Sequence, residues 1–214
     1  MLWSLWLTIA TAPCDRPTGA LSAVCLSTPA PQPLDQRWRD RRASPVDAVR
    51  CFFASLNAHD YEAMRKCYAT SPVTVRNGAR TPVNFDASRG YREFEAATEA
   101  RFSFDLKSSS DTTADVVLHE ESGFLGALGL AEVTADWRYV VRDGVIVEEH
   151  HLRADSAYAV RFREFVRWGR ANQPPLWSSV LDTDGNVRFN GTTARALVAL
   201  GRQWTESRRS RPDL

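Results

Sequence analysis

Lysine is nearly absent from this chain of 214 residues, where it occurs only at Lys66 and Lys107. Arginine supplies almost all of the positive charge, and the totals of 27 basic and 26 acidic residues give a formal net charge of +1. A chain so close to neutral has no global field that would recruit nucleic acid or an anionic membrane, so we expect neither partner. We interpret the arginine bias as a matter of genome composition before a binding feature.

The sequence also lacks any pair of cysteines spaced C-x-x-C, which excludes zinc-ribbon and thioredoxin motifs. Its four cysteines are Cys14, Cys25, Cys51 and Cys67. The first two fall in a tail, and Cys51 points away from the apolar stripe of its helix. We therefore expect four unpaired thiols. We expect no metal and no cofactor, because no ligand-spacing rule joins the histidines and acids.

No apolar run is long enough to cross a bilayer, which needs about 20 residues. The opening stretch "MLWSLWLTIATA" is apolar and ends in an Ala-x-Ala pattern, like a short signal peptide. It has no basic residue before the apolar run, and Pro13 follows it directly. Export, a loose tail and a wrongly assigned start codon stay open as alternatives, with a cytoplasmic location slightly favoured.

Residues 13–43 are rich in Pro, Ser, Ala and Arg and show no hydrophobic period. Together with the opening stretch, they make residues 1–43 a disordered arm or a weak signal-like segment. The rest of the chain is ordinary in composition, because the whole is 43% hydrophobic and 25% charged. A folded core is therefore expected from residue 44 onward.

The folded part is predicted to begin with a tight helical hairpin. Ser44 and Pro45 are suited to the start of a helix, and Asn57 ends it. Asp60 can cap the next helix, which leaves His59 as an exposed turn residue. The apolar positions of the two helices recur at helical spacing: Val46, Val49, Phe53 and Leu56, then Tyr61, Met64 and Tyr68.

A third helix is predicted in residues 88–102, capped by Ser88, with Tyr91 and Phe94 turned inward. A short strand precedes it at residues 72–78. After it the period changes to alternation, which predicts strands at residues 102–106, 114–122, 130–141 and 145–153. This order predicts an α+β domain with helices on one face of a curved antiparallel sheet. From Asp155 the helical period returns, and we expect residues 156–214 to form a helical extension packed on the domain.

The stretches "SLNAHDYEAMRKCYA" and "RDGVIVEE" resemble the first two helices and the last hairpin of the NTF2-like superfamily. The resemblance covers residues 44–155 and is nearest to the SnoaL-like branch, which includes polyketide cyclases and shares its fold with ketosteroid isomerase. It implies a cone, in which the curved sheet wraps the N-terminal helices and leaves a pocket at the open end. Fold alone does not give function, so the pocket residues must decide.

One face of the strand 130–141 carries Ala135, Trp137 and Tyr139, and burying the charged opposite face would be costly. We therefore expect the aromatic face to line the pocket. The hairpin loop then decides which residues of the next strand join it. A three-residue loop at Arg142-Asp143-Gly144 would pair Tyr139 with Val147, Trp137 with Glu149, and Ala135 with His151.

A two-residue loop would instead bring Glu148 and His150 to the pocket face. We prefer Glu149 and His151, because the family places pocket groups at those positions. A His and a Glu on one strand face could act as general base and orienting acid. The alternative is that "EEHH" lies at a solvated strand edge.

The leading hypothesis is a SnoaL-like domain that binds a small, mostly apolar molecule, with isomerase-, cyclase- or dehydratase-like chemistry by His151 and Glu149. The expected ligand-binding residues are Phe52, Tyr91, Phe94, Ala135, Trp137 and Tyr139. Steroid isomerisation is disfavoured, because the family's donor and base positions match residues of other types in this chain. The alternative is a non-catalytic interaction module whose sheet face supports a homodimer.

Overall fold

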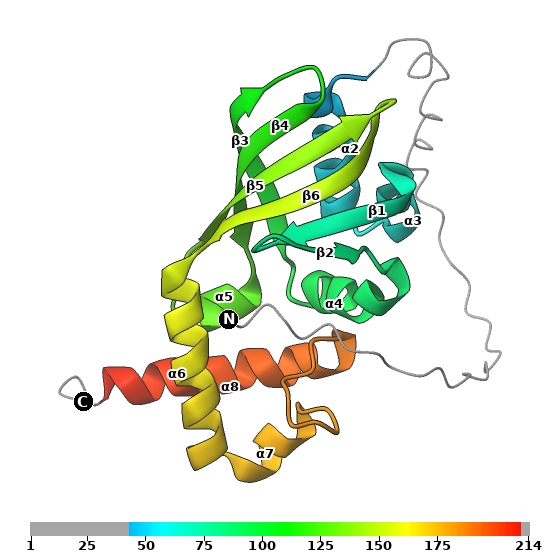
Figure 1. The fold of residues 1–214 in the computed structure, drawn as a ribbon. Helices are drawn as coiled ribbons and strands as arrows, with labels where there is room; N and C mark the ends of the chain where they lie inside the picture. The colour runs from blue at the N-terminus through cyan, green and yellow to red at the C-terminus, as the bar shows by residue number, and fades with distance from the viewer. Residues whose placement is uncertain (1–42, 211–214) are drawn as a thin grey trace, which may run out of the picture.

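A computed structural model describes residues 43–210 of the chain (Figure 1). The predicted arm, residues 1–43, therefore lies outside the described residues except for Ala43. The same holds for Cys14 and Cys25.

A single curved sheet of six strands forms the body of the protein. Its strands are β1 (Tyr68–Arg76), β2 (Ala79–Pro82), β3 (Arg101–Ser109), β4 (Thr113–Glu121), β5 (Val133–Arg142) and β6 (Val145–Ala154). They lie in the order β2-β1-β6-β5-β4-β3. Every neighbouring pair is antiparallel except β1 and β6, which run parallel. This α+β architecture confirms the predicted fold class.

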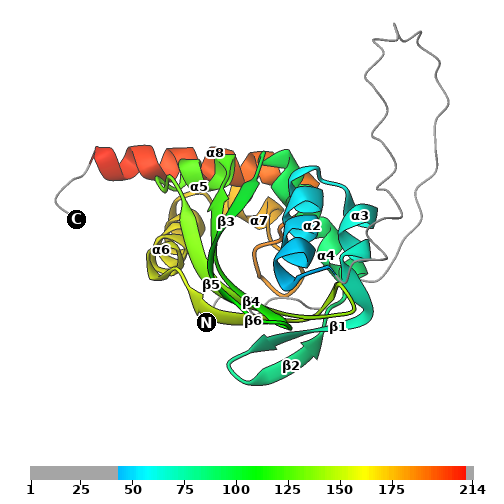
Figure 2. The same ribbon diagram turned by 90° about the horizontal axis from the view of Figure 1, so that it is seen from above.

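Three helices lie in the first part of the chain, α2 (Pro45–Asn57), α3 (Tyr61–Lys66) and α4 (Phe85–Ala97). Viewed from above, the sheet curves around α2 (Figure 2). The side chains of Ser44 and Asp60 cap α2 and α3, as expected. The predicted cap of the third helix is wrong, because Asn84 caps α4 and Ser88 lies inside it. Tyr68 begins β1 instead of ending the second helix.

The hairpin between α2 and α3 is fixed by both its turn and its side chains. His59 is exposed and adopts a left-handed backbone conformation with φ of 52°, as a turn residue can. The Asn57 side chain donates to the carbonyl oxygen of Phe102 at 2.7 Å and accepts from the Phe102 amide at 2.8 Å. These two bonds fasten the end of α2 to the start of β3.

The expectation of four unpaired thiols is wrong, because Cys51 and Cys67 form a disulfide bond. Their Cα atoms are 5.9 Å apart and 16 residues apart in sequence. The hairpin brings them together, since Cys51 lies in α2 and Cys67 ends α3. The sequence pattern missed the pair because it tested only for closely spaced cysteines.

Removal of this disulfide should destabilise the fold. A cross-link that closes a loop of this length restricts the unfolded chain and is worth about 3 kcal/mol. The double variant Cys51→Ser and Cys67→Ser should therefore lower the free energy of unfolding by about that amount in urea titrations. Reduction of the wild-type protein should reproduce the loss, and no effect of either treatment would contradict the pairing.

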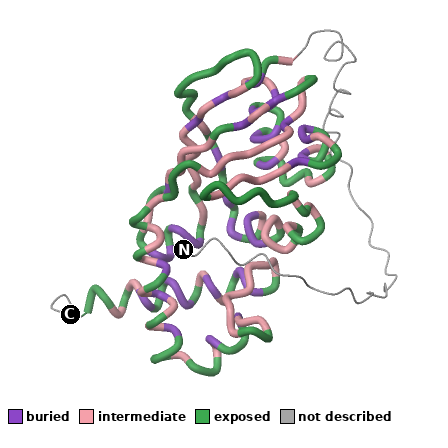
Figure 3. Tube along the Cα trace, viewed as in Figure 1, coloured by how far each residue is buried: buried purple, intermediate pink, exposed green. Residues whose placement is uncertain are grey.

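The buried residues, which are coloured purple in Figure 3, form two clusters. The first lies between the concave face of the sheet and α2, and includes Phe52, Phe53, Tyr68, Val116 and Tyr139. The second joins the lower end of the sheet domain to the C-terminal helices.

The C-terminal extension consists of α6 (Ser156–Asn172), α7 (Pro174–Ser179) and α8 (Gly191–Arg209). It lies below the sheet in Figure 1, with α8 against α4 and the short helix α5 (Gly123–Ala127). The Thr205 hydroxyl donates to the Ala127 carbonyl at 2.7 Å. A Cβ atom on Gly201 would stand 3.0 Å from that of Ala127, so α8 approaches α5 closely. Sequence patterns did not predict α5, α7 or the short strand β2.

Candidate functional site

The β5–β6 hairpin sets the side chains of the predicted site. Its loop has two residues, Asp143 and Gly144, so the predicted three-residue loop is wrong. A bulge at Val147 shifts the register by one residue, so that the residues after it face the side of the sheet that a three-residue loop would have given them. The pairs predicted for the three-residue loop are also wrong, because the structure pairs Tyr139 with Glu149 and Trp137 with His151. Glu149 and His151 consequently share the face of Tyr139 and Trp137, as the sequence predicted.

Glu149 lies inside the cone, held by two hydroxyl groups from β1. Tyr68 Oη donates to Glu149 Oε2 at 2.8 Å, and Thr74 Oγ1 donates to Oε1 at 2.7 Å. Burial raises the pKa of Glu149, and the two hydrogen bonds, Thr74's first, and the positive charge of Arg92 offset part of that rise. The carboxyl group is thereby fixed in place, but by Tyr68 and Thr74 and not by His151.

His151 stacks against Trp137, with 3.8 Å between the ring centroids. Its Nε2 atom is buried and has no hydrogen-bond partner among residues 43–210. Burial lowers the pKa of His151 to about 4, and the positive charges of Arg76 and His150 contribute further. The imidazole is therefore neutral at physiological pH.

Tyr139 is the second buried group without a partner on this face. The residue is 0% exposed, and its hydroxyl has no hydrogen-bond partner within the described part of the chain. A buried unpaired hydroxyl is costly and calls for an explanation, such as a water or a bound molecule. The rings of Phe52 and Trp137 lie 6.0 Å and 5.9 Å from the Tyr139 ring.

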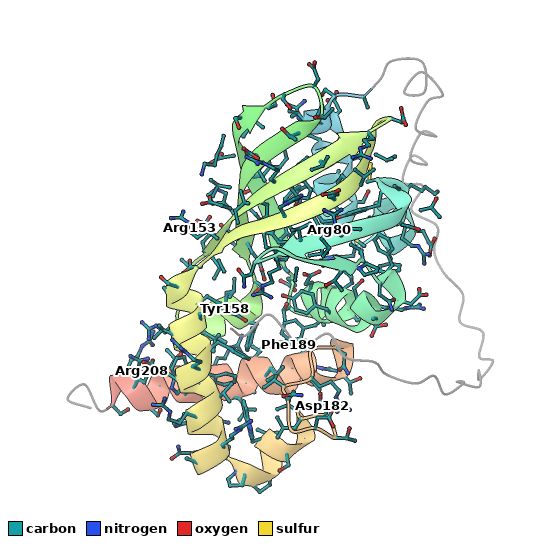
Figure 4. All side chains as sticks on the ribbon, in the orientation of Figure 1. Arg80, Arg153, Tyr158, Asp182, Phe189 and Arg208 are labelled. Atoms are coloured by element: carbon teal, nitrogen blue, oxygen red, sulfur yellow. A yellow bond between two sulfur atoms is a disulfide. The ribbon has the colours of Figure 1, made fainter. Side chains whose placement is uncertain are left out.

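His150 lies on the opposite, outer face of the sheet. Its Nε2 atom is 3.0 Å from Glu148 Oε2, and Glu148 also pairs with Arg80 at 2.7 Å. Arg80 is labelled on the side of the sheet away from α2 in Figure 4. Further ion pairs cover this face, including Arg138 with Asp115 at 2.6 Å. The outer face is thus charged and the inner face largely aromatic.

The structure separates the predicted ligand-binding residues into two groups. Phe52, Trp137 and Tyr139 lie with His151 and Glu149 in the upper part of the cone. Tyr91 and Phe94 lie lower, where both rings contact Phe189 from the C-terminal extension, at 5.9 Å and 5.0 Å. Ala135 is half-buried on β5, one step along the inner face from Trp137 toward the lower group.

The lower group surrounds a cavity of about 10 Å³ at the end of the cone. It is lined by Tyr91, Phe94, Glu120, Phe124, Leu125, Val133, Tyr158 and Phe189. Tyr158 and Phe189 belong to the extension and lie between it and the sheet in Figure 4. Residues of the extension therefore help to close this end of the cone.

On the wall of a groove outside the cone, α4 contributes a buried ion pair that sequence patterns missed. The Arg92 guanidinium donates to Glu95 Oε2 at 2.5 Å. The Glu95 side chain is 4% exposed and that of Arg92 27%. Burial raises the pKa of Glu95 to about 7, although Arg92 opposes the shift. Burial, with the charge of Glu95, raises the pKa of Glu120 to about 8 against the opposing charge of Arg92.

These raised pKa values predict that stability falls as the pH rises through them. A carboxyl group whose folded pKa exceeds its unfolded value of 4.5 binds protons more tightly in the folded state. Between pH 6.5 and 8.5, the titration of Glu120 and Glu95 should together lower the free energy of unfolding by about 3 kcal/mol. Urea titrations of Glu120→Gln should show most of this pH slope removed. The exposed neighbour offers a control, because Glu121→Gln should keep the slope, and equal slopes would contradict the assignment.

A larger groove of about 610 Å³ lies outside the cone between α3 and α4. Arg65 and Asp86 form an ion pair across it at 3.3 Å. Its walls carry many charged side chains, so it does not suit a mostly apolar molecule.

Two kinds of feature are not found in residues 43–210. No group of three or more His, Cys, Asp or Glu side chains is arranged to hold a metal ion. None of the helices that the structure describes is long and apolar enough to cross a membrane.

The fold has counterparts among solved structures. The chain is similar to NTF2-like proteins. One is an NTF2-like protein of unknown function from Cytophaga hutchinsonii, 12% identical, with a TM-score of 0.41 over 56% of this chain and 97% of that protein. Another is IdmH, a candidate polyketide cyclase from Streptomyces antibioticus, 20% identical, with a TM-score of 0.42 over 56% and 98%.

A candidate ketosteroid isomerase from Kribbella flavida is 15% identical and has a TM-score of 0.37 over 48% of this chain and 72% of that protein. No protein-family model matches the chain. No curated protein matches it either. The NTF2-like similarity concerns the fold, and the residues inside the cone must be interpreted by themselves.

The hydrogen-bond partners of Glu149 were not predicted from the sequence. Tyr68 was assigned to a helix, and Thr74 lies on β1, whose parallel pairing with β6 no local pattern indicates. Glu120 was accessible to prediction, because Val116, Leu118 and Glu120 alternate along one strand face. Arg92 and Glu95 lie one helical turn apart, and nothing in that spacing marks them as buried.

Proposed function

We propose that the cone binds a small, mostly apolar molecule and that His151 and Glu149 take part in proton transfer to or from it. One observation carries this proposal. A fixed carboxyl group, Glu149, lies on the same inner face as two buried polar atoms, Tyr139 Oη and His151 Nε2, that have no hydrogen-bond partner within residues 43–210. Buried orphan groups on an aromatic face are what a bound molecule with one or two polar atoms would satisfy.

The roles follow from the charge state of each group. His151 is neutral, so its free ring nitrogen can accept a proton or a hydrogen bond, depending on the tautomer. Burial raises the pKa of Glu149, so its carboxyl group can exchange a proton with a ligand in this site of low polarity. Tyr139 can donate its hydroxyl hydrogen to an oxygen of the ligand. The proposal thus favours a reaction that moves protons, as in an isomerisation, cyclisation or dehydration.

The aromatic side chains on the inner face of the cone favour an apolar ligand. Phe52, Trp137 and Tyr139 present their rings to one another at 5.9–6.0 Å on this side of the cone. An aromatic wall of this kind would hold a ligand mainly through apolar contact, with few polar groups for orientation. The alternative of a dimerisation module would use the outer sheet face, which is rich in ion pairs.

The first experiment is a search for molecules that copurify with the full chain, by native mass spectrometry. We expect an apolar molecule to be released on denaturation and to rebind the refolded wild-type protein. Ala135→Trp, which fills the inner face, should abolish rebinding. Thr134→Trp places the same side chain on the outer face and should not. Equal rebinding by the two variants would contradict a ligand inside the cone.

A further inference from the structure

The disulfide between Cys51 and Cys67 lies next in sequence to two residues of the inner face. Cys67 is followed by Tyr68, whose hydroxyl donates to Glu149 at 2.8 Å. Cys51 is followed by Phe52, whose ring centroid lies 5.5 Å from that of Tyr68. The disulfide therefore joins α2 to the start of β1 beside the contact that holds Tyr68 against Glu149.

The start of β1 is only loosely part of the ladder with β6. Tyr68 pairs with Ile146, the register then shifts, and the next pair is Val73 with Glu148. The Cys67 carbonyl accepts from the Ile146 amide at 2.9 Å. An irregularity of this kind interrupts the regular pairing of two strands. The disulfide thus anchors Tyr68 at a place where the strand ladder gives it little support.

The second hydroxyl that bonds to Glu149 is anchored differently. Thr74 lies beyond the register shift, where it pairs with Glu149 on β6 and with Thr81 on β2. It donates to Glu149 at 2.7 Å from within regular pairing on both sides. A change at the disulfide should therefore reach Tyr68 and leave Thr74 in place.

We propose that the Cys51–Cys67 disulfide is a redox switch of the Glu149 site, in which Tyr68 is the positioning residue that carries the change. The oxidised chain holds the Tyr68 hydroxyl on Glu149, and the reduced chain releases it. Cys51 is exposed and Cys67 is 2% exposed, so a thiol in solvent meets the sulfur atom of Cys51 first. The effect of the switch on turnover rests on the proposed function of Glu149.

The co-reactant is a dithiol. Its first thiolate bonds to Cys51 Sγ, the bond between the two cysteines breaks, and Cys67 leaves as a thiolate that takes up a proton. The second thiolate of the reductant then displaces Cys51 in the same way. Two electrons and two protons pass to the protein, and the dithiol becomes a disulfide.

Release of Tyr68 should change the proton affinity of Glu149. The polar and charged groups that act on this carboxyl are Tyr68 and Thr74 of β1, Tyr139 of β5 and Arg92 of α4. A hydrogen bond donated to a carboxylate favours its charged form. Loss of the Tyr68 bond should therefore raise the pKa of Glu149 further, which corresponds to about a tenfold gain in proton affinity or more.

The test is a titration of the Glu149 carboxyl carbon by ¹³C NMR on the full chain, with and without dithiothreitol. Reduction should raise the proton affinity of Glu149 about tenfold. Tyr68→Phe should produce a similar rise in the oxidised protein and should then respond little to reduction. Thr74→Val is the matched control, because it removes the other hydrogen bond and should still respond as the wild type does. No response of the wild type, or an undiminished response of Tyr68→Phe, would overturn the proposal.

Two further measurements complete the test. Cys51→Ser should show the proton affinity of the reduced state without any reductant and should not respond to dithiothreitol, and a response would overturn the role of this bond. Circular dichroism should show a folded reduced chain, and complete unfolding would overturn the switch. The titration needs no substrate, so its outcome is independent of whether His151 and Glu149 prove to transfer protons.

Discussion

Replacement of His151 by alanine should reduce turnover of any substrate of the cone by about 10²–10⁴-fold, the usual effect of losing a group that transfers protons. The ring nitrogen Nε2 is buried beside Trp137, on the face that Glu149 shares, and no residue in the described part of the chain bonds to it. Alanine removes that nitrogen and leaves the backbone pairing of β6 intact. The measurement is the rate under saturating substrate, once mass spectrometry has supplied a candidate molecule.

The adjacent histidine provides the matched control. His150 lies on the outer face with Glu148, so His150→Ala should change the rate less than about threefold if only the inner face reacts. Both variants remove one imidazole from the same strand and differ only in the face that they alter. Equal losses, or a larger loss at His150, would reject the assignment of the inner face as the reactive one.

The second large effect is expected at the junction with the C-terminal extension. Leu200 of α8 is 0% exposed and belongs to the cluster that contains Phe94, Phe124 and Leu128 of the sheet domain. Leu200→Ala should lower the free energy of unfolding by about 4 kcal/mol, since a buried cavity forms at a site that cannot collapse easily. Urea titrations followed by circular dichroism would measure the change as one shift of the whole transition.

An exposed leucine serves as the comparison. Leu152 on β6 is 54% exposed, and Leu152→Ala should cost less than about 0.5 kcal/mol. A second result matters as much as the magnitude. If Leu200→Ala unfolded the extension while the sheet kept its own transition, the extension would be an independent unit and our interpretation of its docking would be wrong.

Features that depend on nearby residues were predicted correctly from the sequence. Alternation placed Trp137 and Tyr139 on the inner face, since a charged face cannot be buried cheaply. The capping residues Ser44 and Asp60 located the starts of the first two helices. These inferences succeed because each depends on neighbours within one turn or one strand.

Features that depend on distant residues were missed or misjudged. The two-residue loop and the bulge at Val147 place Glu149 and His151 on the predicted face. Their partners on β5 differ from the predicted ones. The disulfide between Cys51 and Cys67 depends on how closely two helices pack. The closure of the cone by Phe189 depends on the docking of α8 against α4 and α5. Only a three-dimensional arrangement reveals such contacts.

The parallel pairing of β1 with β6 has a consequence for synthesis of the chain. Glu149 follows its partner Tyr68 by 81 residues and Thr74 by 75. At about 5–20 residues per second, the ribosome needs roughly 4–16 s to add the stretch between Tyr68 and Glu149. Throughout that interval β1 has only β2 beside it, and its other edge stays unpaired and open to other chains. The sheet, and with it the Glu149 site, can therefore be completed only late in the synthesis of the chain.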